Sequence, residues 1–143
     1  MERTISLRGI GENLATFYVD DATKTKLLAM MPAGSDYVTI PKGGLAVTLT
    51  GDNTVGFGST ATGTITDVFF GLIKSYSGAN TVGVQFTGFA VDVPTKGAIP
   101  IKSTNLIVTN DGALNTIADA TGTCGIVTKA STVNNLTATI KMI

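Results

Sequence analysis

The chain has 143 residues, with 10 Lys and Arg, 10 Asp and Glu and no histidine or tryptophan, so its formal net charge is zero. Charged residues make up 14% of it, whereas about a quarter is usual for a soluble domain. This composition supplies no imidazole for acid–base or metal chemistry and no basic stripe for nucleic-acid phosphates. The surface must be largely threonine, asparagine, glycine and backbone, which favours flat contacts with other proteins over catalysis.

Charge is unevenly distributed along the chain. Half of the charged residues lie in residues 1–42 and half in the remaining 101. We therefore expect two parts, an N-terminal arm or extension at residues 1–36 and a β-domain at residues 37–143. The arm has weak local patterns, so we expect it to become ordered only on binding, at an entropic cost.

Two elements are predicted within the arm. Asp20 and Asp21 can cap a short helix over residues 22–31, because aspartate side chains accept hydrogen bonds from the first amides of a helix. Three apolar residues fall on one face of this helix: Leu27, Leu28 and Met31. Residues 14–19 equally fit a strand.

From residue 37 onward the pattern is typical of β structure. Apolar and hydroxyl residues alternate at period two, and glycine-rich turns separate short segments. The turn at residues 110–112 contains Asp-Gly, a favoured hairpin sequence. The expected strands cover residues 37–40, 45–50, 64–76, 81–89, 99–101, 106–109, 113–117, 125–128 and 136–143. The predicted fold class is all-β, a small single-domain β-sandwich or β-barrel.

The run at residues 68–73 is apolar without interruption. A strand with one solvated face alternates, so a continuous run predicts burial on both faces. We expect this run to be a core strand of the domain and not a ligand site.

Residues 56–61, Gly-Phe-Gly-Ser-Thr-Ala, match a dinucleotide-binding fingerprint. That motif needs a following helix whose N-terminus binds the pyrophosphate. The residues that follow here are β-prone, so a loop is the better interpretation.

Other residues with chemical potential have structural interpretations. Five aspartates are candidates for the paired carboxylates of glycoside chemistry, although those in turns are expected there for backbone hydrogen bonds: Asp52, Asp67, Asp92, Asp111 and Asp119. Four phenylalanines suggest a stacking platform for carbohydrate or nucleotide, but their strand context favours core packing: Phe69, Phe70, Phe86 and Phe89. Cys124 is interpreted as a small buried hydrophobe, since no histidine can activate it. We expect no catalytic, cofactor or metal site.

The N-terminal residues lack the apolar core of a signal peptide, and no run approaches the roughly 20 apolar residues of a membrane helix. The sequence thus predicts a protein made in a cytoplasm, without membrane or direct nucleic-acid contact.

Several segments of glycine and β-branched residues occur in a fixed order in the second half of the chain, at residues 70–73, 77–89, 93–98, 106–112, 125–128 and 138–140. With these segments, the stretch from Thr64 onward resembles the capsid decoration (cement) proteins of tailed bacteriophages. The resemblance covers a little over half of the chain. It implies an all-β virion protein that binds the exterior of the icosahedral capsid and bridges major capsid protein subunits. It also implies a homotrimer or homodimer without cofactors.

Two alternatives remain open at this point. One is another phage structural β-protein, such as a tail-tube or head-tail component. The other is a carbohydrate-binding module.

Overall fold

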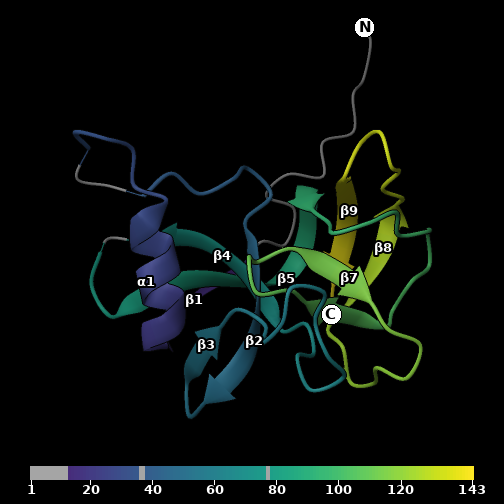
Figure 1. Ribbon diagram of the computed structural model, residues 1–143. Coiled ribbons are helices and arrows are strands. Elements are labelled where there is room, and N and C mark those ends of the chain that lie inside the picture. The colour runs from purple at the N-terminus through teal and green to yellow at the C-terminus, as the bar shows by residue number, and fades with distance from the viewer. Residues whose placement is uncertain (1–12, 36–37, 77) are drawn as a thin grey trace, which may run out of the picture.

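The computed structural model describes residues 13–35, 38–76 and 78–143, which form one short helix and nine strands (Figure 1). In chain order the elements are β1 (Asn13–Val19), α1 (Asp21–Ala29), β2 (Leu45–Gly51), β3 (Thr54–Gly56), β4 (Gly71–Tyr76), β5 (Thr81–Pro94), β6 (Leu106–Val108), β7 (Leu114–Thr116), β8 (Gly125–Lys129) and β9 (Thr137–Met142). The protein is therefore all-β, as predicted, and of the two predicted architectures it adopts a barrel with additional strands.

Five strands close the barrel in the order β1-β3-β2-β4-β5, because β1 pairs with both β3 and β5. The β1–β3 pair is parallel, and the other barrel pairs are antiparallel. Closure removes the free edges that open sheets expose. The barrel wall is thus hydrogen-bonded all the way round.

β5 connects the barrel to a second layer. Its first half pairs with β1 and β4, and from Gly88 onward it pairs with β9, which in turn pairs with β8. The register shifts between Ala90 and Val93, and Gly88 and Asp92 adopt φ values of 87° and 61°. These bulges redirect the strand away from the barrel. β6 and β7 form a separate hairpin over the outer barrel wall.

The barrel wall separates two apolar cores because β2 and β4 alternate side chains between its two faces. The barrel core lies inside, and its members are Val19, Leu27, Val38, Leu45, Val47, Val55, Phe57, Ile73, Tyr76, Val82 and Val84. The outer core lies between the wall and the second layer, and its members are Ala46, Phe69, Leu72, Ala90, Val93, Ile99, Leu106, Val108, Leu114, Val127, Ala138, Ile140 and Met142.

The apolar run at residues 68–73 is buried on both faces, as predicted. Phe69 and Leu72 belong to the outer core, whereas Ile73 belongs to the barrel core. The strand itself begins only at Gly71. Phe70 is half-buried and meets Phe17 edge-to-face, with ring centroids 5.3 Å apart.

The expected separation at residue 36 does not hold for the described part of the arm, residues 13–35. β1 supplies one wall of the barrel, and Leu27 of α1 is fully buried in the barrel core. Burial of apolar area stabilises this segment within the domain itself. Residues 1–12 of the expected arm lie outside the described residues.

The predicted helix and its cap are confirmed with a shorter span. Asp20 is the N-cap, and its Oδ1 accepts a hydrogen bond from the amide of Thr23 at 2.8 Å. The helix ends at Ala29, because the backbone turns at Met30 and Pro32 follows. Leu28 is exposed, so only Leu27 of the three expected apolar residues is fully buried.

Two expected strands are wrong. Residues 38–40 form no strand, since Pro41 ends the segment and Val38 packs as a coil against the barrel core. Residues 99–101 form no strand either. Ile99 is instead buried in the outer core, while the amide of Lys102 donates to Val127 at 2.8 Å and covers the edge of β8.

Candidate contact surface

The aspartates considered for catalysis lie in different turns and loops and in strand β5, where several of them have structural roles. Asp52 and Asp111 lie in the turns of the β2–β3 and β6–β7 hairpins, and Asp119 lies exposed in a loop. The Asp111 carboxylate accepts a hydrogen bond from the Thr109 hydroxyl in its own turn. Among the described residues, no three His, Cys, Asp or Glu side chains gather as a metal site would require.

Asp67 is the buried member of this set, and it organises a loop. Its Oδ2 accepts hydrogen bonds from the amide and hydroxyl of Ser59, at 3.1 and 2.9 Å, and from the amide and hydroxyl of Thr64, at 3.1 and 3.0 Å. Buried carboxylates are stable when hydrogen-bonded in this way. One oxygen thus links two points, Ser59 and Thr64, of the loop between β3 and β4.

The segment at residues 56–61 is a loop and not a dinucleotide-binding turn. No helix follows it, and the chain runs on through bends to Asp67. A Cβ at Gly58 would overlap the carbonyl oxygen of Val108, so this glycine allows the loop to lie against β6. The glycine spacing therefore serves packing.

The aromatic and thiol candidates are also structural. Phe69 is fully buried, while Phe70, Phe86 and Phe89 are half-buried, so none forms an exposed platform. Cys124 is half-buried, and burial raises the pKa of its thiol. A raised pKa lowers the thiolate fraction at neutral pH, which makes the sulfur a poor nucleophile.

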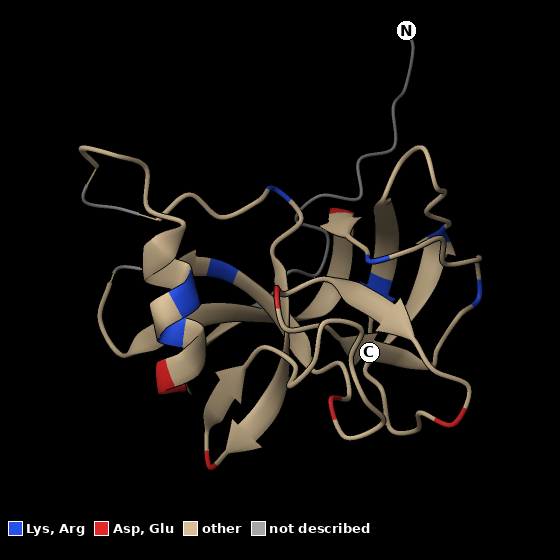
Figure 2. Ribbon diagram, in the orientation of Figure 1, with Lys and Arg blue, Asp and Glu red and all other residues tan. Residues whose placement is uncertain are grey.

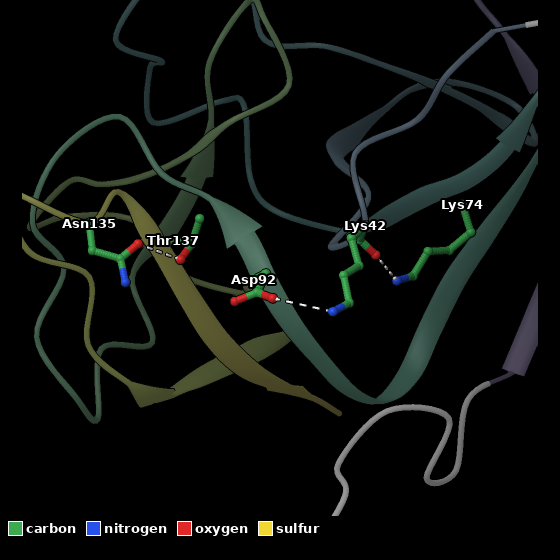
Figure 3. A network of polar contacts seen from close by, with 5 residues as sticks. All are labelled: Lys42, Lys74, Asp92, Asn135 and Thr137. Carbon is green, nitrogen blue, oxygen red and sulfur yellow. Dashed lines mark hydrogen bonds and ion pairs between the residues drawn. The ribbon is translucent and has the colours of Figure 1, made fainter.

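A group of polar contacts lies at the irregularity of β5 around Asp92 (Figure 3). The Lys42 ammonium lies 3.9 Å from the Asp92 carboxylate, and the Lys74 ammonium donates to the Lys42 carbonyl at 3.2 Å. Both members of the ion pair are exposed, and such pairs contribute little to stability. This group is an exposed set of contacts between Lys42, before β2, and the strands β4 and β5.

The three barrel strands β1, β2 and β3 are free of charged residues. Asp52 marks the turn between the last two (Figure 2). Leu14 and Tyr18 of β1 are 55% and 58% exposed, and exposed Thr16 lies between them. The strand that the sequence predicts at residues 14–19 is confirmed as β1.

A shallow hollow of about 290 Å³ lies on the barrel where β1, β5 and β4 meet. It is lined by Thr16, Ser75, Tyr76, Thr81, Val82 and Gly83. Gly83 of β5 pairs with Thr16 of β1 on one side and with Ser75 of β4 on the other. A Cβ at Gly83 would overlap the Ser75 hydroxyl, so the absence of a side chain there lets this hydroxyl lie over the strand at the floor of the hollow.

The loop between β8 and β9, here called the tip loop (residues 130–136), projects on the opposite side of the molecule from α1 and β1 (Figure 1). Val133 is 80% exposed within it, and Leu136 is also exposed. The turn is closed by amide–carbonyl hydrogen bonds between Thr132 and Asn135 in both directions, at 2.9 and 3.0 Å. The Thr137 hydroxyl adds a hydrogen bond to Asn135 (Figure 3).

The base of the tip loop is fixed to the neighbouring chain. The Ser131 hydroxyl is buried, accepts from the amide of Ile99 at 2.8 Å and donates to the carbonyl of Gly97 at 2.9 Å. Ile101, in that neighbouring segment, is exposed. The tip loop therefore holds an exposed apolar side chain on a constrained backbone.

Comparison of the chain with protein-family models, with curated proteins and with solved structures finds no match. No helix in the described ranges combines the length and apolar character needed to cross a membrane.

Proposed function

We propose that this chain is a virion structural protein, a capsid decoration protein that binds the exterior of an icosahedral phage shell and bridges major capsid protein subunits. The observation that carries the proposal is Val133, an exposed apolar side chain on the hydrogen-bonded tip loop. A constrained loop loses little conformational entropy on docking, so more of its contact energy is available for binding.

The charge pattern and the sequence resemblance support the same proposal. Near-zero net charge removes the repulsion that keeps copies of a protein apart. Weak repulsion between copies favours dense packing of the protein on a shell. The partners proposed are the major capsid protein and other copies of this chain, as a homotrimer or homodimer. In this proposal the protein is made in the host cytoplasm and then binds to the capsid exterior.

The proposal is tested with purified particles. We expect the protein to sediment with intact capsids at a stoichiometry near that of the major capsid protein. We also expect it to remain bound in roughly molar salt, because apolar contacts are not screened as exposed ion pairs are. Its absence from purified particles would refute the proposal.

The tip loop is tested separately by a matched pair of variants. Val133→Asp should release the protein from particles, whereas Asn134→Asp adds the same charge at the next exposed position and should leave it bound. Equal release by both variants would show that added charge, and not loss of the valine, weakens the attachment.

The alternative structural role gives a different result in light scattering. A tail-tube protein forms large rings, whereas a decoration protein is expected as a monomer, dimer or trimer in solution. Large rings of the isolated protein would favour the tail component.

A further inference from the structure

The hollow over Gly83 is lined by groups suited to a hydroxyl-rich ligand. Thr16, Ser75 and Thr81 are among its lining residues, and the Ser75 hydroxyl lies over Gly83. The described residues provide no hydrogen-bond partner for any of these three hydroxyls. A hydroxyl group both donates and accepts hydrogen bonds. Three such groups around one depression can therefore bind a ligand that also donates and accepts.

Tyr18 lies beside the hollow, next to two of its lining residues, and adds an aromatic ring there. It is the register partner of Thr81 and lies two residues from Thr16, so its ring is on the same face of the barrel as the hollow. The ring is 58% exposed. Tyrosine presents an apolar ring face together with a hydroxyl, a combination that suits ligands with one apolar and one polar side.

The electrostatics of the hollow select for neutral ligands. None of its six lining residues is charged. Lys24 reaches the neighbouring residue Asn80, but its ammonium donates to the Asn80 side chain at 2.7 Å. The volume of about 290 Å³ lies just below the range for drug-sized ligands, so the hollow suits a ligand of a single ring.

From these observations we infer that the hollow over Gly83 binds a neutral sugar, with the sugar ring against Tyr18 and its hydroxyls on Thr16, Ser75 and Thr81. An apolar protein side chain would leave these three hydroxyls without partners, which is unfavourable once water is excluded. The site lies on β1, β4 and β5, across the molecule from the tip loop (Figure 1). Sugar binding is thus independent of the proposed attachment to the capsid.

The inference is tested on the full-length, isotope-labelled protein by NMR titration with glucose, galactose, mannose and N-acetylglucosamine. A single-ring ligand on a shallow site binds weakly, so the titration extends to about 50 mM, beyond a dissociation constant in the millimolar range. At least one sugar should shift the amide resonances of Tyr18, Thr81 and Gly83 in a saturable way and leave Val133 unchanged. Glucuronate should bind no better than glucose.

Four variants locate the site. Tyr18→Ala should weaken binding about fivefold, since aromatic contacts contribute on the order of 1 kcal/mol. Tyr18→Phe keeps the ring and should retain most of the affinity. Gly83→Ala places a methyl group at the floor of the hollow, displaces the Ser75 hydroxyl and should abolish binding. The fold should tolerate this variant, because the Ser75 hydroxyl can rotate to admit the methyl group. Leu14→Ala, on the same face but outside the lining, is the control and should bind as the wild type does.

Unchanged spectra away from the hollow verify that each variant is folded. The inference is overturned if no sugar gives a saturable shift, if the shifts map outside the hollow, or if Tyr18→Ala binds as tightly as the wild type. Because binding is measured on the free protein, failure here leaves the particle test of the proposed function unaffected.

Discussion

The barrel core and the outer core are stabilised in different ways. The barrel is closed by strand pairing, so its backbone is satisfied by a continuous ladder. The outer core is covered by the three-residue strands β6 and β7, by the β8–β9 pair and by loops. Short covering elements contribute few ladder hydrogen bonds, so the outer layer depends more on side-chain packing and on close backbone contacts.

Glycine positions make this difference visible. At Gly43 a Cβ would overlap the carbonyl of Asp92 in β5, and at Gly58 it would overlap that of Val108 in β6. Both glycines lie where a loop passes directly against a strand. The second layer is therefore held at a distance from the barrel that admits no added methyl group.

The largest expected effect tests the packing of the outer core. Phe69→Ala should lower the free energy of unfolding by about 3–5 kcal/mol, because it removes a fully buried ring. Phe70→Ala should cost clearly less, since Phe70 is only half-buried where it packs against the barrel core and Phe17. Urea denaturation of both variants measures the difference. Equal losses of stability in the two variants would contradict the conclusion that Phe69 is the more deeply buried residue of the two.

The next effect tests the close contact at β5. Gly43→Ala should destabilise by about 1–3 kcal/mol, because the overlapping group is backbone and cannot rotate away. Gly97→Ala is the matched control, since a Cβ there meets no atom within 4 Å. Thermal unfolding should show a lowered midpoint for the first variant alone. A normal midpoint for Gly43→Ala would mean that the second layer shifts without cost.

A comparable effect is expected at the buried carboxylate between the two layers. Asp67→Asn replaces one acceptor oxygen of the side chain by a donor, so Ser59 and Thr64 lose part of their hydrogen bonding, at about 1–3 kcal/mol. Asp119→Asn removes an exposed carboxylate and should be nearly neutral. Denaturant unfolding measures both, and a neutral Asp67→Asn would show that the loop needs no charged acceptor.

The smallest effect has the opposite sign and concerns the barrel core. The Tyr76 hydroxyl is buried and has no hydrogen-bond partner among the described residues. Tyr76→Phe should therefore stabilise the protein by about 1 kcal/mol. Tyr18→Phe, on the exposed face, should change stability little. A loss of stability in Tyr76→Phe would reveal a partner for the hydroxyl, such as a bound water.

The same residue gives a pH dependence. Burial raises the pKa of Tyr76 above its ordinary value of 10.0. The folded state then retains the proton above pH 10, where the unfolded state begins to lose it, so stability is unaffected below pH 10 and falls as the pH rises further. Unfolding measurements between neutral and strongly alkaline pH should show this fall in the wild type and a smaller one in Tyr76→Phe.

Local sequence patterns predicted elements whose causes are local. The hairpin at residues 106–117 follows from Asp-Gly in its turn, and the cap of α1 follows from Asp20. The interpretation of residues 56–61 as a loop is also confirmed. Residues 99–101 were misassigned because their β-like composition reflects burial of Ile99 and not strand pairing.

The sequence by itself determined an all-β protein with few charged groups and a central segment buried on both faces, because composition and side-chain periodicity are properties of the chain alone. Only the tertiary structure decided that β1 closes the barrel, since that depends on pairing between residues more than 60 positions apart, such as Thr16 and Gly83. The same long-range pairing assembles the hollow from three strands. No local pattern contains that information, because the register between distant strands is set by how the two cores pack against one wall.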